Sequence, residues 1–177
     1  SCLTSDNSKI SVSTLFYSYN HPNSGSYVYR PAGEVMTLYD EGDLRRDISI
    51  TTLDNLDFIN KYPSGQTGTD PMVISRLAEM YLISAEAQGV EKGLPRLNEL
   101  RNRRGLANIY PSSEAKFIDA LLEERRRELL CENHRWYDLV RLGKAVEVLG
   151  IQPYQTLMPV PASERAANKN LTQNDGY

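Results

Sequence analysis

The sequence predicts a mainly α-helical protein with extensive loops. Between residues 71 and 150, apolar residues recur at intervals of three and four, which places them on one face of a helix. Residues 1–70 instead carry many turn signals and are rich in Ser, Asn, Gly, Asp and Tyr, and residues 151–177 are interrupted by Pro153, Pro159 and Pro161. We therefore expect an irregular tyrosine-rich segment (1–70), a core of about four helices in hairpins (71–150) and an extended tail (151–177).

The composition is that of one soluble domain. The chain has 177 residues, enough for a single core, and its 20 basic and 23 acidic residues give a net charge of -3. This balance provides no one-signed field for nucleic acid or anionic lipid. We expect no nucleic-acid partner, and no apolar run is long enough to span a membrane.

The first two helices are predicted as a hairpin. The first begins near Pro71 and is expected to end at Gly89 and Gly93. The second has Pro95 in its first turn and ends at Gly105. The apolar stripe of the first helix is formed by Ile74, Leu77, Ala78, Tyr81, Leu82 and Ala85.

The third and fourth helices follow after Pro111. Ser112 or Ser113 can cap the third helix, and Glu114 complements its N-terminal dipole. The fourth helix is predicted from His134 or Arg135 to about Gly150. The apolar residues of the two helices are Phe117, Ile118, Leu121, Leu122 and Leu129, then Trp136, Leu139, Val140 and Val146.

Charged residues in the helices favour structural pairing over chemistry. Glu79 and Glu86 lie seven positions apart on one helix face, so an acid/base pair is an alternative to ion pairing within the helix packing. Arg125 falls on an apolar stripe and needs a partner, which Glu79, Glu128 or Glu132 could supply.

Catalytic, metal and cofactor sites are not predicted. His21 and His134 are isolated in the sequence, and the acids between Asp40 and Asp47 lack calcium-loop spacing. The two cysteines, Cys2 and Cys131, form neither a metal-ligand cluster nor a disulfide-dense scaffold.

Aromatic residues gather in residues 16–29, and we name this group the aromatic segment. Rings interrupted by Asn, Ser, Pro and Gly suit sugars, whose C–H faces stack on rings while their hydroxyls meet polar neighbours. The alternative is that the rings pack a half of the chain that lacks aliphatic residues, and both can hold. The predicted ligand-binding residues are Phe16, Tyr17, Tyr19, His21, Tyr27 and Tyr29.

Six motifs in one order make the chain resemble the SusD/RagB family. They lie in residues 31–46, 76–87 (RLAEMYLISAEA), 97–106, 124–129, 135–143 and 159–177. Asn133 stands where the family usually has Gly, and Asn tolerates the left-handed backbone. The charged and aromatic motif residues, interpreted as structural, are Arg76, Glu79, Glu86, Arg101, Glu124, Arg125, Glu128, Arg135, Trp136, Asp138 and Arg141.

The resemblance implies the C-terminal half of an outer-membrane nutrient-binding lipoprotein. Such a protein captures glycans at the cell surface for a SusC-like TonB-dependent transporter and catalyses nothing. The N-terminal half and the lipid anchor are expected upstream, while the chain itself is expected to be soluble. The competing hypotheses are a helical, tetratricopeptide-like interaction scaffold and, behind it, a glycoside hydrolase using Glu79 and Glu86.

Overall fold

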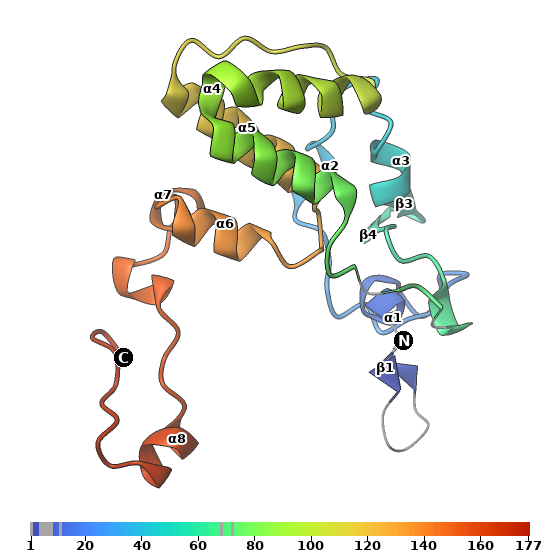
Figure 1. The fold of residues 1–177 in the computed structure, drawn as a ribbon. Coiled ribbons are helices and arrows are strands. Elements are labelled where there is room, and N and C mark those ends of the chain that lie inside the picture. The colour runs from blue at the N-terminus through green and yellow to red at the C-terminus, as the bar shows by residue number, and fades with distance from the viewer. Residues whose placement is uncertain (1, 4–8, 11, 68, 72) are drawn as a thin grey trace. The chain divides into compact units, whose positions relative to one another are not determined.

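The computed structural model describes residues 2–3, 9–10, 12–67, 69–71 and 73–177, and it is mainly helical, as predicted (Figure 1). The chain divides into two compact units, Ser1–Glu132 and Asn133–Tyr177. This boundary falls within the segment predicted as the helical core. The single-domain organisation therefore stays a prediction.

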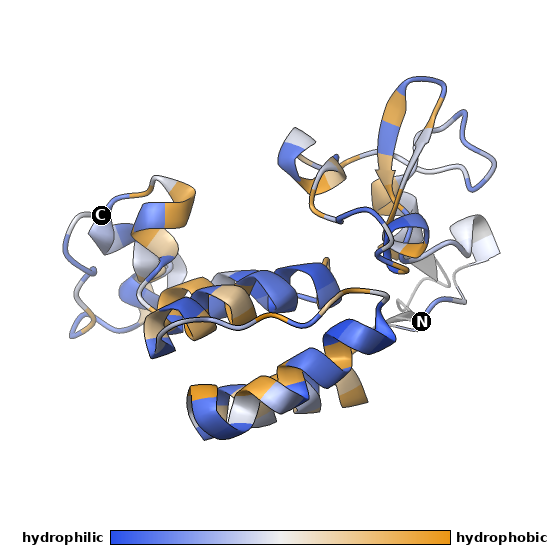
Figure 2. Ribbon diagram, turned by 90° about the horizontal axis from the view of Figure 1, so that it is seen from above, coloured by the Kyte–Doolittle hydropathy of each residue, from blue (hydrophilic) through white to orange (hydrophobic). Residues whose placement is uncertain are grey.

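The first unit is built around a long broken helix and its partner. Helix α4 spans Leu77–Arg103 and is interrupted at Gly89, whose φ of 66° and ψ of -175° lie outside the helical region. Helix α5 spans Glu114–Glu128 and packs against α4. Figure 2 shows polar and apolar residues alternating along these helices, as expected for amphipathic elements. Their buried cluster consists of Ala78, Leu82, Ala85, Leu97, Leu100, Phe117, Leu121 and Leu129.

The first half of α4 starts later than predicted. Arg76 is extended, with φ -151° and ψ 162°, and the helix begins at Leu77 instead of near Pro71. Ile74 and Leu77, both predicted in the apolar stripe, are 85% and 72% exposed. The extended backbone places the Arg76 side chain beside Glu128 of α5 and Glu132 after it, and this long-range contact was not visible in the local pattern.

Gly93 permits close packing and does not end a helix. It lies within the second half of α4, and a Cβ at this position would stand 1.9 Å from the Ala85 carbonyl oxygen. The prediction that Gly93 helps to stop the first helix is therefore wrong, whereas the break at Gly89 is confirmed. Glu114 accepts a hydrogen bond from the Val90 backbone N–H at 3.0 Å, so its carboxylate caps the second half of α4.

Helix α5 begins as predicted. The Ser113 hydroxyl accepts a hydrogen bond from the Lys116 N–H at 3.3 Å and forms the N-cap. The stripe residues Phe117, Leu121 and Leu122 are buried. Of the two serines that the sequence allowed as the N-cap, Ser113 therefore takes this role.

Residues before α4 form short elements, including a strand hairpin that the sequence pattern did not predict. The helices are α1 (Val12–Phe16), α2 (Gly33–Met36) and α3 (Arg46–Ser49), followed later by the 3-10 turn η1 (Gly65–Thr67). Strands β1 (Cys2–Leu3) and β2 (Lys9–Ile10) pair antiparallel, as do β3 (Ile50–Leu53) and β4 (Leu56–Ile59). Asp54 and Asn55 join β3 to β4 with φ of 51° and 60°, a two-residue turn that these residue types favour. A second apolar cluster consists of Phe16, Leu38, Tyr39, Ile50, Ile59 and Tyr62.

The second unit is more segmented than predicted. The expected fourth helix is divided into α6 (Arg135–Arg141) and α7 (Ala145–Leu149), because Gly143 between them has a φ of 67°. After the 3-10 turn η2 (Pro153–Thr156), the tail contains helix α8 (Ala162–Ala167), which corrects the expectation of a wholly extended tail. Pro161 directly precedes α8, a position where the lack of an N–H costs no hydrogen bond.

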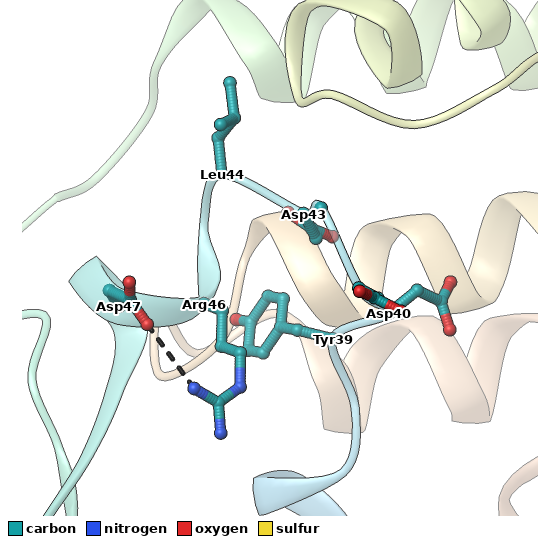
Figure 3. Close-up of a pocket in the computed structure, with 8 residues that line it drawn as sticks. Tyr39, Asp40, Asp43, Leu44, Arg46 and Asp47 are labelled. Carbon is teal, nitrogen blue, oxygen red and sulfur yellow. Dashed lines mark hydrogen bonds and ion pairs between the residues drawn. The ribbon is translucent and has the colours of Figure 1, made fainter.

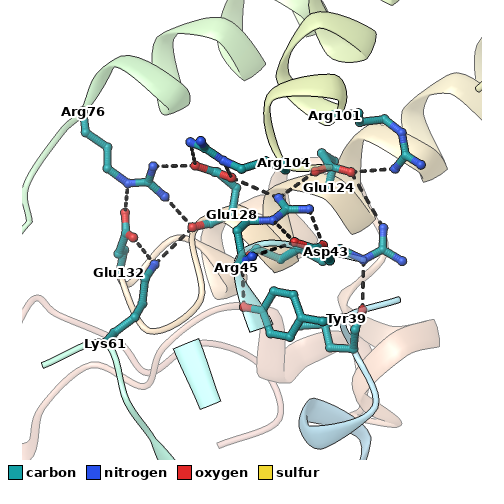
Figure 4. A network of polar contacts seen from close by, with 12 residues as sticks. Tyr39, Asp43, Arg45, Lys61, Arg76, Arg101, Arg104, Glu124, Glu128 and Glu132 are labelled. Carbon is teal, nitrogen blue, oxygen red and sulfur yellow. Dashed lines mark hydrogen bonds and ion pairs between the residues drawn. The ribbon is translucent and has the colours of Figure 1, made fainter. Parts of the chain in front are cut away.

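Buried charges join the short elements to α5 (Figure 4). The Arg45 guanidinium donates hydrogen bonds to Asp43 at 2.7 Å, to Glu124 at 2.7 Å and to Glu128 at 3.0 Å. All four of these residues are buried. Arg45 therefore fixes the turn before α3 against α5.

Further cations surround the same carboxylates. Arg101 contacts the second oxygen of Glu124 at 2.8 Å, and Arg104 donates two hydrogen bonds to Glu128 at 2.9 and 2.7 Å. Arg76 bridges Glu128 and Glu132, at 2.6 and 2.8 Å, and Lys61 pairs with Glu132. In this charged network, Glu124, Glu128 and Glu132 thus each meet two or more cations, and Asp43 meets Arg45.

The pKa of Glu128 shows which effect dominates in the charged network. Burial alone raises the pKa of a carboxyl group. The hydrogen bonds and charges of Arg104 and Arg76 outweigh that burial and lower the pKa of Glu128 to about 2. Glu128 is therefore ionised at neutral pH despite its burial.

Replacing Glu128 by Gln should lower the free energy of unfolding at pH 7 by roughly 3 kcal/mol, because cations are left around a neutral amide. The folded pKa of about 2 lies below the ordinary value of 4.5. The stability from this charge is therefore complete above about pH 4.5 and is lost as the pH falls toward 2. Denaturant unfolding from pH 7 to pH 2 should show the wild type and Glu128→Gln converging in acid.

The matched control is Asp47→Asn, whose carboxylate is 90% exposed beside Arg46. It should leave the denaturation midpoint unchanged. A Glu128→Gln variant as stable as the wild type at pH 7 would contradict the assigned role of the network.

Gly93→Ala should destabilise the chain by roughly 1–3 kcal/mol, since the added methyl group meets the Ala85 carbonyl. Helix propensity alone predicts the opposite sign, because Ala favours helices over Gly by about 1 kcal/mol. Gly33→Ala is the control, because a Cβ there has nothing within 4 Å. Thermal unfolding distinguishes the two signs, and a stabilised Gly93→Ala variant would refute the close contact.

Candidate functional site

The aromatic segment is held by backbone hydrogen bonds to α1. The N–H of Ser26 donates to the Thr14 carbonyl at 2.7 Å, and that of Tyr29 donates to the Leu15 carbonyl at 3.0 Å. Gly25 approaches α1 so closely that a Cβ would lie 2.3 Å from the Tyr17 carbonyl oxygen. The loop that carries the rings is therefore fixed against the rest of the first unit.

Tyr27 occupies a backbone conformation that is costly for a bulky residue. Its φ is 49°, in the left-handed region. Its hydroxyl donates to the Asp57 carbonyl at 2.6 Å, and its ring centroid lies 5.1 Å from that of Phe58. These contacts with β4 offset the backbone strain and fix the ring.

Two rings of the segment are packing residues. Phe16 and Tyr17 are buried. The Tyr17 ring lies 4.3 Å from the His21 ring and 5.8 Å from Phe58, and its hydroxyl donates to Asn60 at 2.6 Å. Burial raises the pKa of Tyr17 and lowers that of His21, so both are neutral at pH 7. Neither Phe16 nor Tyr17 presents a ring to solvent for stacking.

The remaining rings reach the surface to different extents. Tyr19 is 83% exposed and Tyr29 is 57% exposed. Tyr27 and His21 are half-buried, and the Arg30 guanidinium lies 4.7 Å above the Tyr27 ring. Rings with free faces beside guanidinium and amide groups can stack on sugar C–H surfaces and donate to hydroxyls. Ligand binding by the aromatic segment stays a prediction.

Phe58 belongs to the same ring cluster but was missed in the sequence. It contacts Tyr17, His21 and Tyr27 from strand β4. The available signal was the Asp54-Asn55 pair, which is typical of a hairpin turn between two strands.

An open hollow of about 580 Å³ lies beside the acidic residues between Asp40 and Asp47 (Figure 3). Three of its four acids have cationic neighbours: Asp43 binds Arg45 at 2.7 Å, Asp47 lies 3.4 Å from Arg46, and Asp40 lies 3.6 Å from Arg127. In the described part of the chain, no group of three or more His, Cys, Asp or Glu side chains could hold a metal ion.

The motif residues interpreted as structural lie in several places. Arg76, Arg101, Glu124 and Glu128 meet in the charged network, and Arg125 is buried on α5. In the second unit, Arg135 and Trp136 begin α6, where Arg141 donates to the buried Asp138 at 2.8 Å. Asn133 has a φ of 64°, the left-handed conformation that the sequence predicted for it.

Glu79 and Glu86 have the wrong geometry for a hydrolase pair. Both are half-buried on the first half of α4. Seven residues along a helix correspond to about 10 Å of rise, and both side chains project from the same helix face. Glycosidase carboxylates instead oppose each other across the scissile bond.

Comparison with known proteins places these features in a family. Residues 53–156 match the SusD family. The chain is 34% identical over 126 residues to SusD-like protein P38 of Formosa agariphila, covering 60% of this chain and 24% of that protein. It is 33% identical over 117 residues to the starch-binding protein SusD of Bacteroides thetaiotaomicron, covering 58% and 21%. The chain thus spans about a quarter of the length of these relatives.

Solved structures agree with this assignment. A SusD superfamily protein from Bacteroides thetaiotaomicron aligns with a TM-score of 0.75 at 23% identity, covering 93% of this chain and 42% of that one. A laminarin binding SusD-like protein aligns with a TM-score of 0.66 at 29% identity, covering 82% and 38%. Because more than half of the residues match the family, the chain belongs to the SusD family.

Proposed function

We propose that this chain is part of a non-catalytic surface protein that binds glycans and delivers oligosaccharides to a SusC-like TonB-dependent transporter. The observation that carries the proposal is the aromatic segment, where Tyr19 and Tyr29 are exposed and the N–H of Tyr29 is hydrogen-bonded to the Leu15 carbonyl. Family membership supports it, since relatives include proteins named for binding starch and laminarin.

The physical requirement for such binding is modest. A millimolar affinity corresponds to only about -4 kcal/mol, within reach of a few stacked rings and hydrogen bonds. A backbone that is already ordered loses little entropy when the ligand arrives. Tyr29 meets this condition, because its N–H is bonded to α1 while more than half of its side chain remains exposed.

A protein contact is the second candidate, favoured by an apolar surface on α4. Leu77, Met80 and Ile83 are exposed at intervals of three along the first half of this helix. We propose that this surface contacts further chain of the longer protein, since the relatives are about four times as long as the matched region. A lipid anchor in the outer membrane would belong to that further chain. No helix in the described residues is long and apolar enough to cross a bilayer.

Tyr19→Ala and Tyr29→Ala should each weaken the retention of the 177-residue chain in affinity electrophoresis through starch or laminarin gels. Loss of one stacking ring should raise the apparent Kd about two- to tenfold. Thermal stability should be unchanged in Tyr19→Ala, whose side chain lies mainly in solvent. It should fall only slightly in Tyr29→Ala, whose half-exposed ring also lies 6.1 Å from the Phe16 ring. Tyr27→Ala is unsuitable for this test, since it also removes the contacts with Asp57 and Phe58.

Tyr137→Ala is the matched control, an exposed tyrosine of the second unit (69% exposed) that should leave retention unchanged. If the wild type is retained and the Tyr19 and Tyr29 variants migrate identically to it, the aromatic segment does not bind the glycan.

A further inference from the structure

A second hollow lies on the helical hairpin, away from the aromatic segment in sequence. Its volume is about 410 Å³, within the size range of small-molecule sites. It is lined by the second half of α4 and by the connection to α5. Its lining includes Glu91, Glu99, Asn102, Asn108 and Tyr110, and we name the site the Tyr110 hollow.

The Tyr110 ring is exposed, although the residue before it, Ile109, is fixed by hydrogen bonds. The buried Asn98 side chain accepts from the Ile109 N–H at 2.9 Å and donates to the Ile109 carbonyl at 3.1 Å. Ile109 also packs against the main apolar cluster. Tyr110 follows directly, yet it is 80% exposed. The fold thus fixes the backbone beside this ring without using the ring in the core.

The polar groups of the Tyr110 hollow suit sugar hydroxyls. Asn108 Nδ2 lies 3.5 Å from the Tyr110 hydroxyl. Glu99 Oε1 accepts from Arg103 at 3.0 Å, which orients that carboxylate, while Asn102 and Glu91 are exposed. Amides and carboxylates both bind hydroxyl groups, and the ring supplies an apolar face for C–H bonds.

The charge of the lining selects among glycans. Glu91 and Glu99 contribute two carboxylates, and no lining residue, all of which are described, is cationic. Arg103, which does not line the hollow, pairs with Glu99 at 3.0 Å, so the repulsion of an anion rests mainly on Glu91. A uronate or a sulfated sugar would meet the like charge of Glu91, which disfavours binding. A neutral sugar does not meet this repulsion.

We propose that the Tyr110 hollow is a second carbohydrate subsite, selective for neutral sugars. The inference rests on the proposed glycan-binding function and adds a second contact point to it. Tyr110 stacks on the sugar ring, and Asn102 and Glu99 bind its hydroxyls. Two weak contacts on one polysaccharide raise retention above that of either alone.

Affinity electrophoresis of the 177-residue chain tests the site with starch and laminarin as neutral polysaccharides and alginate as an anionic one. Tyr110→Ala and Asn102→Ala should raise the apparent Kd for a neutral polysaccharide about two- to tenfold. Tyr110→Phe keeps the ring and should retain most of the affinity. Tyr137→Ala is again the control, and circular dichroism melting should show all four variants folded.

The possible failures are distinguishable. If Tyr19→Ala and Tyr29→Ala lose retention while Tyr110→Ala and Asn102→Ala match the wild type, the second subsite is wrong and the proposed function stands. A wild type that no neutral polysaccharide retards overturns both. Retention by alginate that is lost in Tyr110→Ala, with none by neutral gels, overturns the selectivity for neutral sugars.

Discussion

The contact of Arg45 with Asp43, Glu124 and Glu128 is the interaction on which the first unit depends. It joins a turn of the irregular segment to the C-terminal turns of α5, across a sequence separation of about eighty residues. A buried guanidinium is costly unless its donors are satisfied, and the planar group meets three carboxylates at once. Glu124 and Glu128 also form ion pairs with Arg76, Arg101 and Arg104, which come from both ends of α4. One buried charge cluster therefore sets the positions of α4, α5 and the turn before α3.

The charged network also supports the aromatic segment through a short chain of contacts. Lys61 binds Glu132, and the next residue, Tyr62, donates its hydroxyl to the Cys131 carbonyl at 2.9 Å. The Tyr62 ring stacks on the Phe16 ring, with 6.0 Å between the ring centroids. Phe16 is the last residue of α1, the helix to which the aromatic segment is hydrogen-bonded. Apolar residues of similar volume could be equally stabilising in such a core. Charged pairs, however, allow few alternative ways for the elements that carry them to pack together. They therefore suit the irregular segment (1–70), which has short helices and little sheet.

The sequence predicted those features that depend on local pattern. Helical periodicity gave α5 with its Ser113 cap and the break in α4 at Gly89, because caps and amphipathic stripes are read from neighbouring residues. It gave Gly93 the wrong role, since the close approach to Ala85 arises only after the chain has folded back. Composition identified the aromatic segment but could not separate its buried rings from its exposed ones. Phe58, about forty residues further on, covers Tyr17 and leaves Tyr19 in solvent. Tyr110 was missed because a single tyrosine in a loop carries no pattern.

The two candidate sugar contacts share one construction, in which a fixed backbone carries an exposed ring. The Leu15 carbonyl accepts a hydrogen bond from the N–H of Tyr29, and the Asn98 side chain accepts one from the N–H of Ile109, the residue before Tyr110. Sugars are strongly hydrated, so a weak site gains mainly by avoiding the entropy cost of ordering its own loop. The buried charges and hydrogen bonds provide that order without entering the ligand surface. A mutation in the charged network should therefore weaken binding only through stability, whereas loss of an exposed ring should weaken binding at unchanged stability.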